Sequence, residues 1–219
     1  MTRVAERDPE YVKQLEDTLK KFLEPVHGLP LGVVVRALTG HSAIAWRDED
    51  AHCQALKPPL CDGIAEATRS IGREGLDASR PNEIGNHIER PVASALTVKG
   101  FVAEVPPSAS GRRQSSGYPD ILLTMPPHPP IYLEVKTYSA ASEATTFRSF
   151  YFSPPLSKVS QDAYHLLVAF EIERRAARFH PVRFRLYSID NLLLDVKYEF
   201  NTSNKVLYST CPVIAEGTA

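Results

Sequence analysis

Three charged residues stand at the ends of two apolar runs in the stretch SGYPDILLTMPPHPPIYLEVKTYS. Asp120 opens the first run, and Glu134 and Lys136 lie two positions apart near the end of the second. The proline-rich turn between the runs predicts a β-hairpin. If Met125 faces Ile131 across this hairpin, Asp120 lies opposite Lys136. The three charged side chains then project from one face, because alternate residues of a strand share a face.

Such a face suits metal-assisted hydrolysis of a phosphodiester. Two carboxylates held close together in a packed sheet repel one another, so a cation is expected between them. Mg²⁺ takes oxygen ligands and commonly binds one or two carboxylates together with water and a phosphate. Asp120 and Glu134 are therefore the predicted ligands for Mg²⁺, and Mn²⁺ is expected to substitute for it. Lys136 is placed to align the attacking water or to stabilise charge on a phosphate oxygen.

The elements around this hairpin follow an α/β order. The stretch RPNEIGNHIERPVASALTVKG predicts a helix that ends at Gly100, with Pro91 expected to kink it or to mark an offset in its start. The strand FVAEV follows, then the hairpin, and later the apolar runs AYHLLVAFEI and VRFRLYSI predict two more strands. We therefore expect an α/β fold with a central mixed β-sheet flanked by helices.

The N-terminal part is expected to be mainly helical. DPEYVKQLEDTLKKFLEPV carries an apolar stripe at helical spacing. The apolar run from Leu31 to Trp46 fits a helix or a strand, and its periodicity does not decide between them. We divide the chain into a helical part at residues 1–75, for dimerisation or for clamping DNA, and a core at residues 76–219 that also holds DNA-recognition elements. Both are expected to belong to one compact unit.

Composition limits the possible functions. The chain has 219 residues, a formal net charge of −1 and three cysteines. Because the charge is nearly balanced, contacts to nucleic acid must come from local patches. The odd number of cysteines argues against a disulfide framework. No apolar run is long enough to span a membrane, and the N-terminus lacks the pattern of a signal peptide, so a cytoplasmic location is expected.

The PD pair that ends at Asp120, followed by the EVK triplet from Glu134 to Lys136, resembles the PD-(D/E)xK nuclease superfamily. The resemblance covers about residues 80–170 and implies a restriction-endonuclease-like core. IERPVASALTVKGFVAEV is similar to the helix and strand that precede the PD pair in archaeal Holliday-junction resolvases. This likeness implies that Glu89 helps to organise the metal site, directly or through water. Glu83 is the alternative for this role.

The superfamily includes type II restriction endonucleases, junction resolvases and repair nucleases. This chain adds long segments before and after the core, as a sequence reader requires, and carries no Walker ATPase motif. We therefore favour a Mg²⁺-dependent type II restriction endonuclease of a prokaryotic cell that cuts double-stranded DNA as a homodimer. A cognate DNA methyltransferase is expected in the same host. The alternatives are a structure-selective junction or repair nuclease and a non-catalytic DNA-binding protein on the same fold.

DNA contacts are expected from polar and basic loops. SASGRRQSSGY precedes the PD pair, TTFRSFYFS follows the EVK triplet, and EFNTSNKVLYS lies near the C-terminus. Asn and Lys side chains suit the edges of adenine and guanine, and Arg suits a phosphate. The candidate DNA-binding residues are Arg112, Arg113, Arg148, Asn201, Asn204 and Lys205. A further basic run, ERRAARFHPVRFR, is a candidate phosphate patch, and a solvated surface explains it nearly as well.

Overall fold

A computed structural model describes most of the chain. The described residues are 8–24, 26–77, 84–108, 116–142, 150–198, 201–210 and 212–215. The chain forms two compact units: the larger comprises Leu29–Leu193, and the smaller comprises Met1–Gly28 and Leu194–Ala219. The helix at residues 51–74 shares its core with the sheet. The division at residue 75 made from the sequence stays a prediction.

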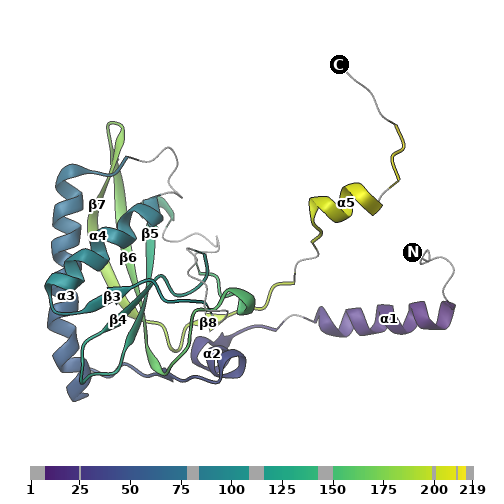
Figure 1. The fold of residues 1–219 in the computed structure, drawn as a ribbon, viewed down its shortest axis with the longest axis horizontal. Coiled ribbons are helices and arrows are strands. Elements are labelled where there is room, and N and C mark those ends of the chain that lie inside the picture. Colours follow the sequence, from purple (N-terminus) through teal and green to yellow (C-terminus); the bar gives the residue numbers. More distant parts are fainter. Residues whose placement is uncertain are drawn as a thin grey trace. The chain divides into compact units, whose positions relative to one another are not determined.

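The larger unit is built on a mixed six-stranded sheet (Figure 1). Its strand order is β2-β6-β5-β4-β3, and β7 pairs with β6. β2 and β5 run parallel to β6, and the other neighbours are antiparallel. The strands are β2 (Ala43–Ile44), β3 (Val102–Glu104), β4 (Ile121–Thr124), β5 (Ile131–Tyr138), β6 (Ala163–Arg175) and β7 (Arg178–Ser188). This architecture confirms the predicted mixed α/β sheet.

The remaining elements are helices and one pair of short strands. β1 (Leu29–Pro30) and β8 (Leu193–Leu194) form a separate two-stranded sheet. The larger unit contains the helices α2 (Leu31–Thr39), α3 (Ala51–Glu74) and α4 (Ile84–Val98), and the 3₁₀ turns η3 (Ala140–Ser142) and η4 (Pro154–Leu156). The smaller unit contains α1 (Pro9–Phe22) and α5 (Asn204–Thr210).

Local sequence accounts for most helix ends. α1 begins as predicted, with the Asp8 side chain accepting a hydrogen bond from Glu10 N. The ambiguous apolar run forms α2, and Gly40 ends this helix at a φ of +78° before the short strand β2. α3 lies in the N-terminal part that is predicted to be mainly helical, but its charges and its two prolines obscure its own periodicity. Pro91 lies inside α4 and does not end it.

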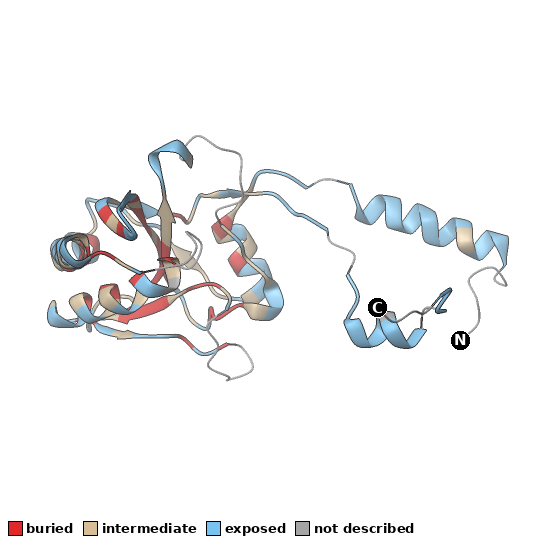
Figure 2. Ribbon diagram, turned by 90° about the horizontal axis from the view of Figure 1, so that it is seen from above, coloured by how far each residue is buried: buried red, intermediate tan, exposed pale blue. Residues whose placement is uncertain are grey.

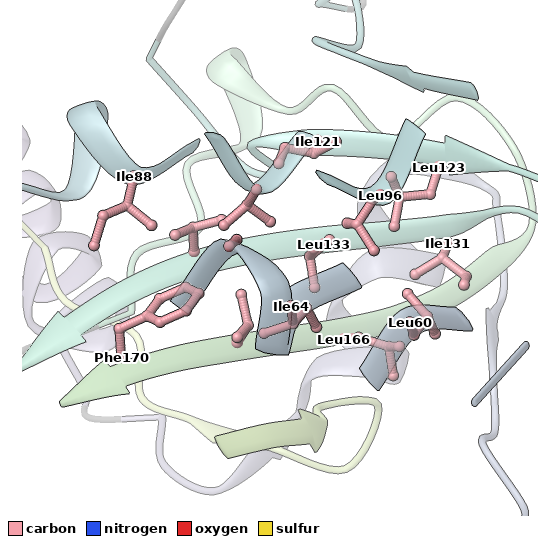
Figure 3. Close-up of a cluster of buried hydrophobic side chains, with 14 of the residues drawn as sticks. Leu60, Ile64, Ile88, Leu96, Ile121, Leu123, Ile131, Leu133, Leu166 and Phe170 are labelled. Carbon is pink, nitrogen blue, oxygen red and sulfur yellow. The ribbon is translucent and has the colours of Figure 1, made fainter. Parts of the chain in front are cut away.

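The main core lies between one face of the sheet and the helices α3 and α4 (Figure 3). Both helices direct apolar side chains onto β4, β5 and β6. The labelled members of this cluster are Leu60, Ile64, Ile88, Leu96, Ile121, Leu123, Ile131, Leu133, Leu166 and Phe170. Burial of this apolar surface is the main source of the stability of the sheet.

The β4–β5 hairpin has a register two residues away from the one assumed from the sequence. Leu122 pairs with Tyr132, and not with Glu134. His128 N donates to Met125 O at 3.0 Å, so Met125 lies in the turn and not opposite Ile131. A shift by two leaves every side chain on its predicted face, because strand faces alternate with period two.

The smaller unit exposes its helices. No residue of α1 is buried, and the described side chains of α5 are likewise exposed (Figure 2). None of the helices in the described part of the chain is long and apolar enough to cross a bilayer.

We predict that Leu133→Ala lowers the free energy of unfolding by about 2–5 kcal/mol, because Leu133 is fully buried in the main core and truncation leaves a cavity. Val98→Ala, at a position that is 82% exposed, is the control and should change it by less than about 0.5 kcal/mol. Urea denaturation followed by circular dichroism measures both values. Equal effects of the two substitutions would contradict the assignment of the core.

Candidate active site

The β4–β5 hairpin places Asp120, Glu134 and Lys136 together on the sheet face opposite the main core. Asp120 Oδ2 accepts a hydrogen bond from Val135 N at 2.8 Å, which ties the start of β4 to the middle of β5. Lys136 Nζ donates to Glu134 Oε1 at 2.6 Å. Continuing the strand register sets Asp120 across from Glu134, whereas the sequence had placed it across from Lys136.

Glu134 is buried and incompletely satisfied. Its exposed fraction is 4%, and its second oxygen, Oε2, has no hydrogen-bond partner within the described part of the chain. A buried acceptor without a donor is costly, and a cation bound there would satisfy it. The residues present therefore fit a hard divalent cation with Asp120 and Glu134 as oxygen ligands.

The pKa values of both hairpin carboxyls are raised. For Asp120 and for Glu134, the main cause of the higher pKa is burial, which disfavours the charged form. For Glu134, the negative charge of Asp120 raises the pKa further, and the ammonium group of Lys136 opposes this increase. The two carboxylates thus share a poorly solvated site in which positive charge is favoured.

Glu89 on α4 belongs to the same electrostatic cluster. Its carboxyl is half-buried, and its pKa is raised to about 7 by burial and by the charge of Asp120. Lys158 and Lys136 act in the opposite direction. The rival carboxylate, Glu83, lies outside the described residues. Among the residues that the structure describes, no three Asp, Glu, His or Cys side chains converge closely enough to hold one ion together. Whether Glu89 would bind a cation directly or through water stays a prediction.

A second lysine at the site was not foreseen. Lys158 lies between η4 and β6, and it is almost completely buried. Its Nζ donates to Pro119 O at 3.2 Å. Its pKa is lowered by burial, while the charges of Asp120, Glu134 and Glu89 oppose this decrease. Nothing in the surrounding letters SPPLSKVSQ distinguishes this lysine from a surface residue, because the contact depends on chain segments that are distant in sequence.

Comparison with known proteins agrees with this geometry. Residues 25–211 match the model of the type II restriction enzyme MjaV family. The chain belongs to this family. It is also 29% identical, over 225 residues, to the type II restriction enzyme MjaV of Methanocaldococcus jannaschii, an alignment that covers 95% of this chain and 97% of the relative. Membership of the MjaV family confirms the predicted function, a type II restriction endonuclease.

The candidate DNA-binding residues of this MjaV-family chain are only partly described. Arg112, Arg113 and Arg148 lie outside the described residues. Asn201 and the first two residues of α5, Asn204 and Lys205, are exposed and belong to the smaller unit. Their role in DNA recognition stays a prediction.

The arginines of the basic run around β6 and β7 all have partners within the chain. Three form ion pairs with carboxylates, and two lie over aromatic rings. The pairs are Arg175 with Glu173, Arg178 with Asp77, Arg183 with Glu171, Arg174 over Phe179 and Arg185 over Tyr138. These partners favour a structural role for the run over the phosphate patch considered from the sequence.

A buried Tyr–His pair supports the PD segment of this endonuclease. The hydroxyl of Tyr118 and Nδ1 of His165 are hydrogen-bonded at 2.6 Å. The rings of Phe150 and Phe152 pack edge-on against Tyr118. Burial lowers the pKa of His165 to about 4, because the charged imidazolium is poorly solvated there. The sequence signal was a single histidine inside the apolar run AYHLLVAFEI, to which we had given no role.

We predict that His165 makes the enzyme less stable in mild acid. The pKa of His165 is about 4 in the folded state and about 6.5 in the unfolded chain, so the unfolded chain takes up a proton first as the pH falls. The free energy of unfolding should therefore decrease from pH 6.5 towards pH 4, by at most about 3 kcal/mol from this group.

The measurement is urea denaturation of the wild type and of His165→Phe between pH 7 and pH 4. The difference in unfolding free energy between the two proteins should shift in favour of the variant as the pH falls. A difference that is independent of pH would show that His165 is not held neutral by burial.

Proposed function

We propose that this endonuclease hydrolyses phosphodiester bonds of double-stranded DNA in a reaction that requires Mg²⁺, with Asp120 and Glu134 as the metal ligands. Mn²⁺ is expected to replace Mg²⁺. The observation that carries the proposal is the buried, unpartnered Oε2 of Glu134 beside the carboxylate of Asp120. When bound, the cation supplies charge neutralisation at a phosphate oxygen and a lowered pKa for a coordinated water.

The chain's own residues supply positioning. Val135 N holds one oxygen of Asp120, which leaves the other, Oδ1, available as a ligand. Lys136 holds Oε1 of Glu134, which directs Oε2 as the second ligand. Fixed ligands on a rigid sheet cost less conformational entropy on binding than ligands on loops. Glu89 is proposed to act through water as a supporting carboxylate.

Lys136 is the proposed group that faces the reacting phosphate. Its side chain is 32% exposed, whereas the side chain of Glu134 beside it is 5% exposed. An ammonium group that is anchored by Glu134 and reaches solvent can align the attacking water or donate to a phosphate oxygen. It can also compensate the charge that builds up as the bond breaks.

An enzyme that cuts both DNA strands is expected to act with partners. Two active sites related by a two-fold axis match the symmetry of a palindromic site, so a homodimer is proposed. Residues 1–75 are proposed to serve in dimerisation or as a DNA clamp. A methyltransferase that protects the host DNA is proposed in the same prokaryotic cell, with both proteins in the cytoplasm.

Cleavage assays test the metal and the site residues together. We predict that plasmid and phage DNA yield discrete fragments with Mg²⁺ and none with EDTA. Asp120→Asn, Glu134→Gln and Lys136→Ala should each slow cleavage by on the order of 10²-fold or more, because each removes a charge needed in the transition state. Glu89→Gln should have a smaller effect.

Glu173→Gln is the matched control for the carboxylate variants. Glu173 is an exposed carboxylate of β6 paired with Arg175, and it lies away from the hairpin charges. Its cleavage rate should equal that of the wild type. Metal-dependent cleavage that survives Glu134→Gln at full rate would exclude the proposed site.

Calorimetric titration with Mn²⁺ tests the ligands without DNA. Glu134→Gln should weaken Mn²⁺ binding by roughly tenfold or more, because an amide oxygen carries no charge to attract the cation. Glu173→Gln should bind Mn²⁺ as the wild type does. Equal affinity of the wild type and Glu134→Gln would assign the metal to other residues.

A further inference from the structure

Lys158 is a charged residue buried as deeply as the main core. Its exposed fraction is 1%. Removing an ammonium group from water is costly, and buried lysines are tolerated only where charge and hydrogen bonds compensate the lost hydration. The neighbours of Lys158 therefore indicate what its charge is for.

Lys158 binds two successive carbonyl groups immediately before Asp120. Its backbone N donates to Tyr118 O at 2.9 Å, and its Nζ donates to Pro119 O at 3.2 Å. With the bond from Val135 N to the Asp120 side chain, the PD segment is fixed from both sides. Lys158 thus contacts the backbone that carries a proposed metal ligand.

The charge of Lys158 acts on the same cluster. Its ammonium group interacts electrostatically with the carboxylates of Asp120, Glu134 and Glu89. Lys136, the other ammonium group of the cluster, is partly open to solvent, whereas Lys158 is closed off from it. A buried group does not reach a DNA phosphate in this structure, so Lys158 would act indirectly, through the PD backbone and the carboxylates.

We propose that Lys158 is a positioning residue of the endonuclease: it clamps the Tyr118 and Pro119 carbonyls and balances the buried carboxylates, so that Asp120 is held in its ligand position. The proposal rests on the proposed role of Asp120 as a metal ligand. It assigns a second lysine to the active site, with a role separate from that of Lys136.

Lys158→Met tests this role, because it keeps the length of the side chain and removes both the charge and the donor. The measured quantity is the single-turnover cleavage rate per folded molecule at saturating Mg²⁺ and DNA. The temperature is one at which circular dichroism shows that the variant is folded. The expected result is a loss on the order of 10²-fold, the size expected for a reactive group moved by about 1 Å. Higher Mg²⁺ should not restore the rate, because removing a positive charge does not weaken the attraction of a cation.

Tyr132→Phe is the matched control. Tyr132 is fully buried, and its hydroxyl accepts a hydrogen bond from Ser160 N at 2.9 Å, so it holds the same segment as Lys158 without touching the PD carbonyls. This variant should lose stability and keep the cleavage rate of the wild type. If folded Lys158→Met cleaves as fast as Tyr132→Phe, Lys158 is merely structural and the proposal is overturned.

A stability measurement gives a second test that does not require cleavage. Lys158→Met should lower the urea midpoint less in an Asp120→Asn background than in the wild type, because the carboxylate that the ammonium group compensates is already neutral. Should Lys158→Met alone not fold, the proposal requires the double variant to fold. Equal losses in both backgrounds, or an unfolded double variant, overturn it. If the wild type does not cleave DNA with Mg²⁺, the proposed metal dependence alone is contradicted. The difference in the effect of Lys158→Met between the two backgrounds then still tests the role of Lys158.

Discussion

The candidate active site depends on the compensation of charge among buried groups. Asp120, Glu134 and Glu89 bring negative charge to one end of the sheet, and Lys136 and Lys158 bring positive charge. Coulomb interactions are strong there because little solvent screens them. The raised pKa values of the three carboxyls show that the two ammonium groups compensate only part of the cost of burial. This remaining deficit of positive charge is the basis for the proposal that the site binds a divalent cation.

The charged residues of the site come from separate segments of the chain. The β4–β5 hairpin carries two carboxylates and one lysine, α4 adds Glu89, and the segment before β6 adds Lys158. The main core on the opposite face holds the hairpin rigid through α3 and α4 (Figure 3). Charged groups and the main core thus occupy opposite faces of the same strands, so the site can hold charge without interrupting the core.

Some features of the fold were accessible from the sequence because they depend on local pattern alone. The hairpin charges stay on one face when the strand register shifts by an even number of residues, because side chains alternate between the two faces. The register itself depends on the conformation of the turn at Met125 and His128, which composition does not reveal. The apolar stripe of α3 is hidden in the sequence by its prolines and charges, and α2 ends where Gly40 adopts a left-handed φ.

The residues of the candidate site likewise include some with a local sequence signal and some without one. Asp120, Glu134 and Lys136 were proposed because a hairpin brings near neighbours together, and Glu89 was proposed through a family resemblance; the structure places them in one electrostatic cluster. Lys158 and His165 were missed because their partners lie in other strands and loops, and long-range contacts leave no local pattern. The sequence also did not reveal that the arginines of β6 and β7 pair with carboxylates and aromatic rings, for the same reason.

The position of a bound metal would show directly whether Asp120 and Glu134 are its ligands. A crystal of the wild-type protein soaked in Mn²⁺ and measured at the manganese absorption edge locates the ion by its anomalous scattering. We expect a peak within coordination distance of Asp120 Oδ1 and Glu134 Oε2. A peak at another group, such as the histidine pair His52 and His128, whose Nδ1 atoms lie 3.0 Å apart, with none at the hairpin carboxylates, would contradict it.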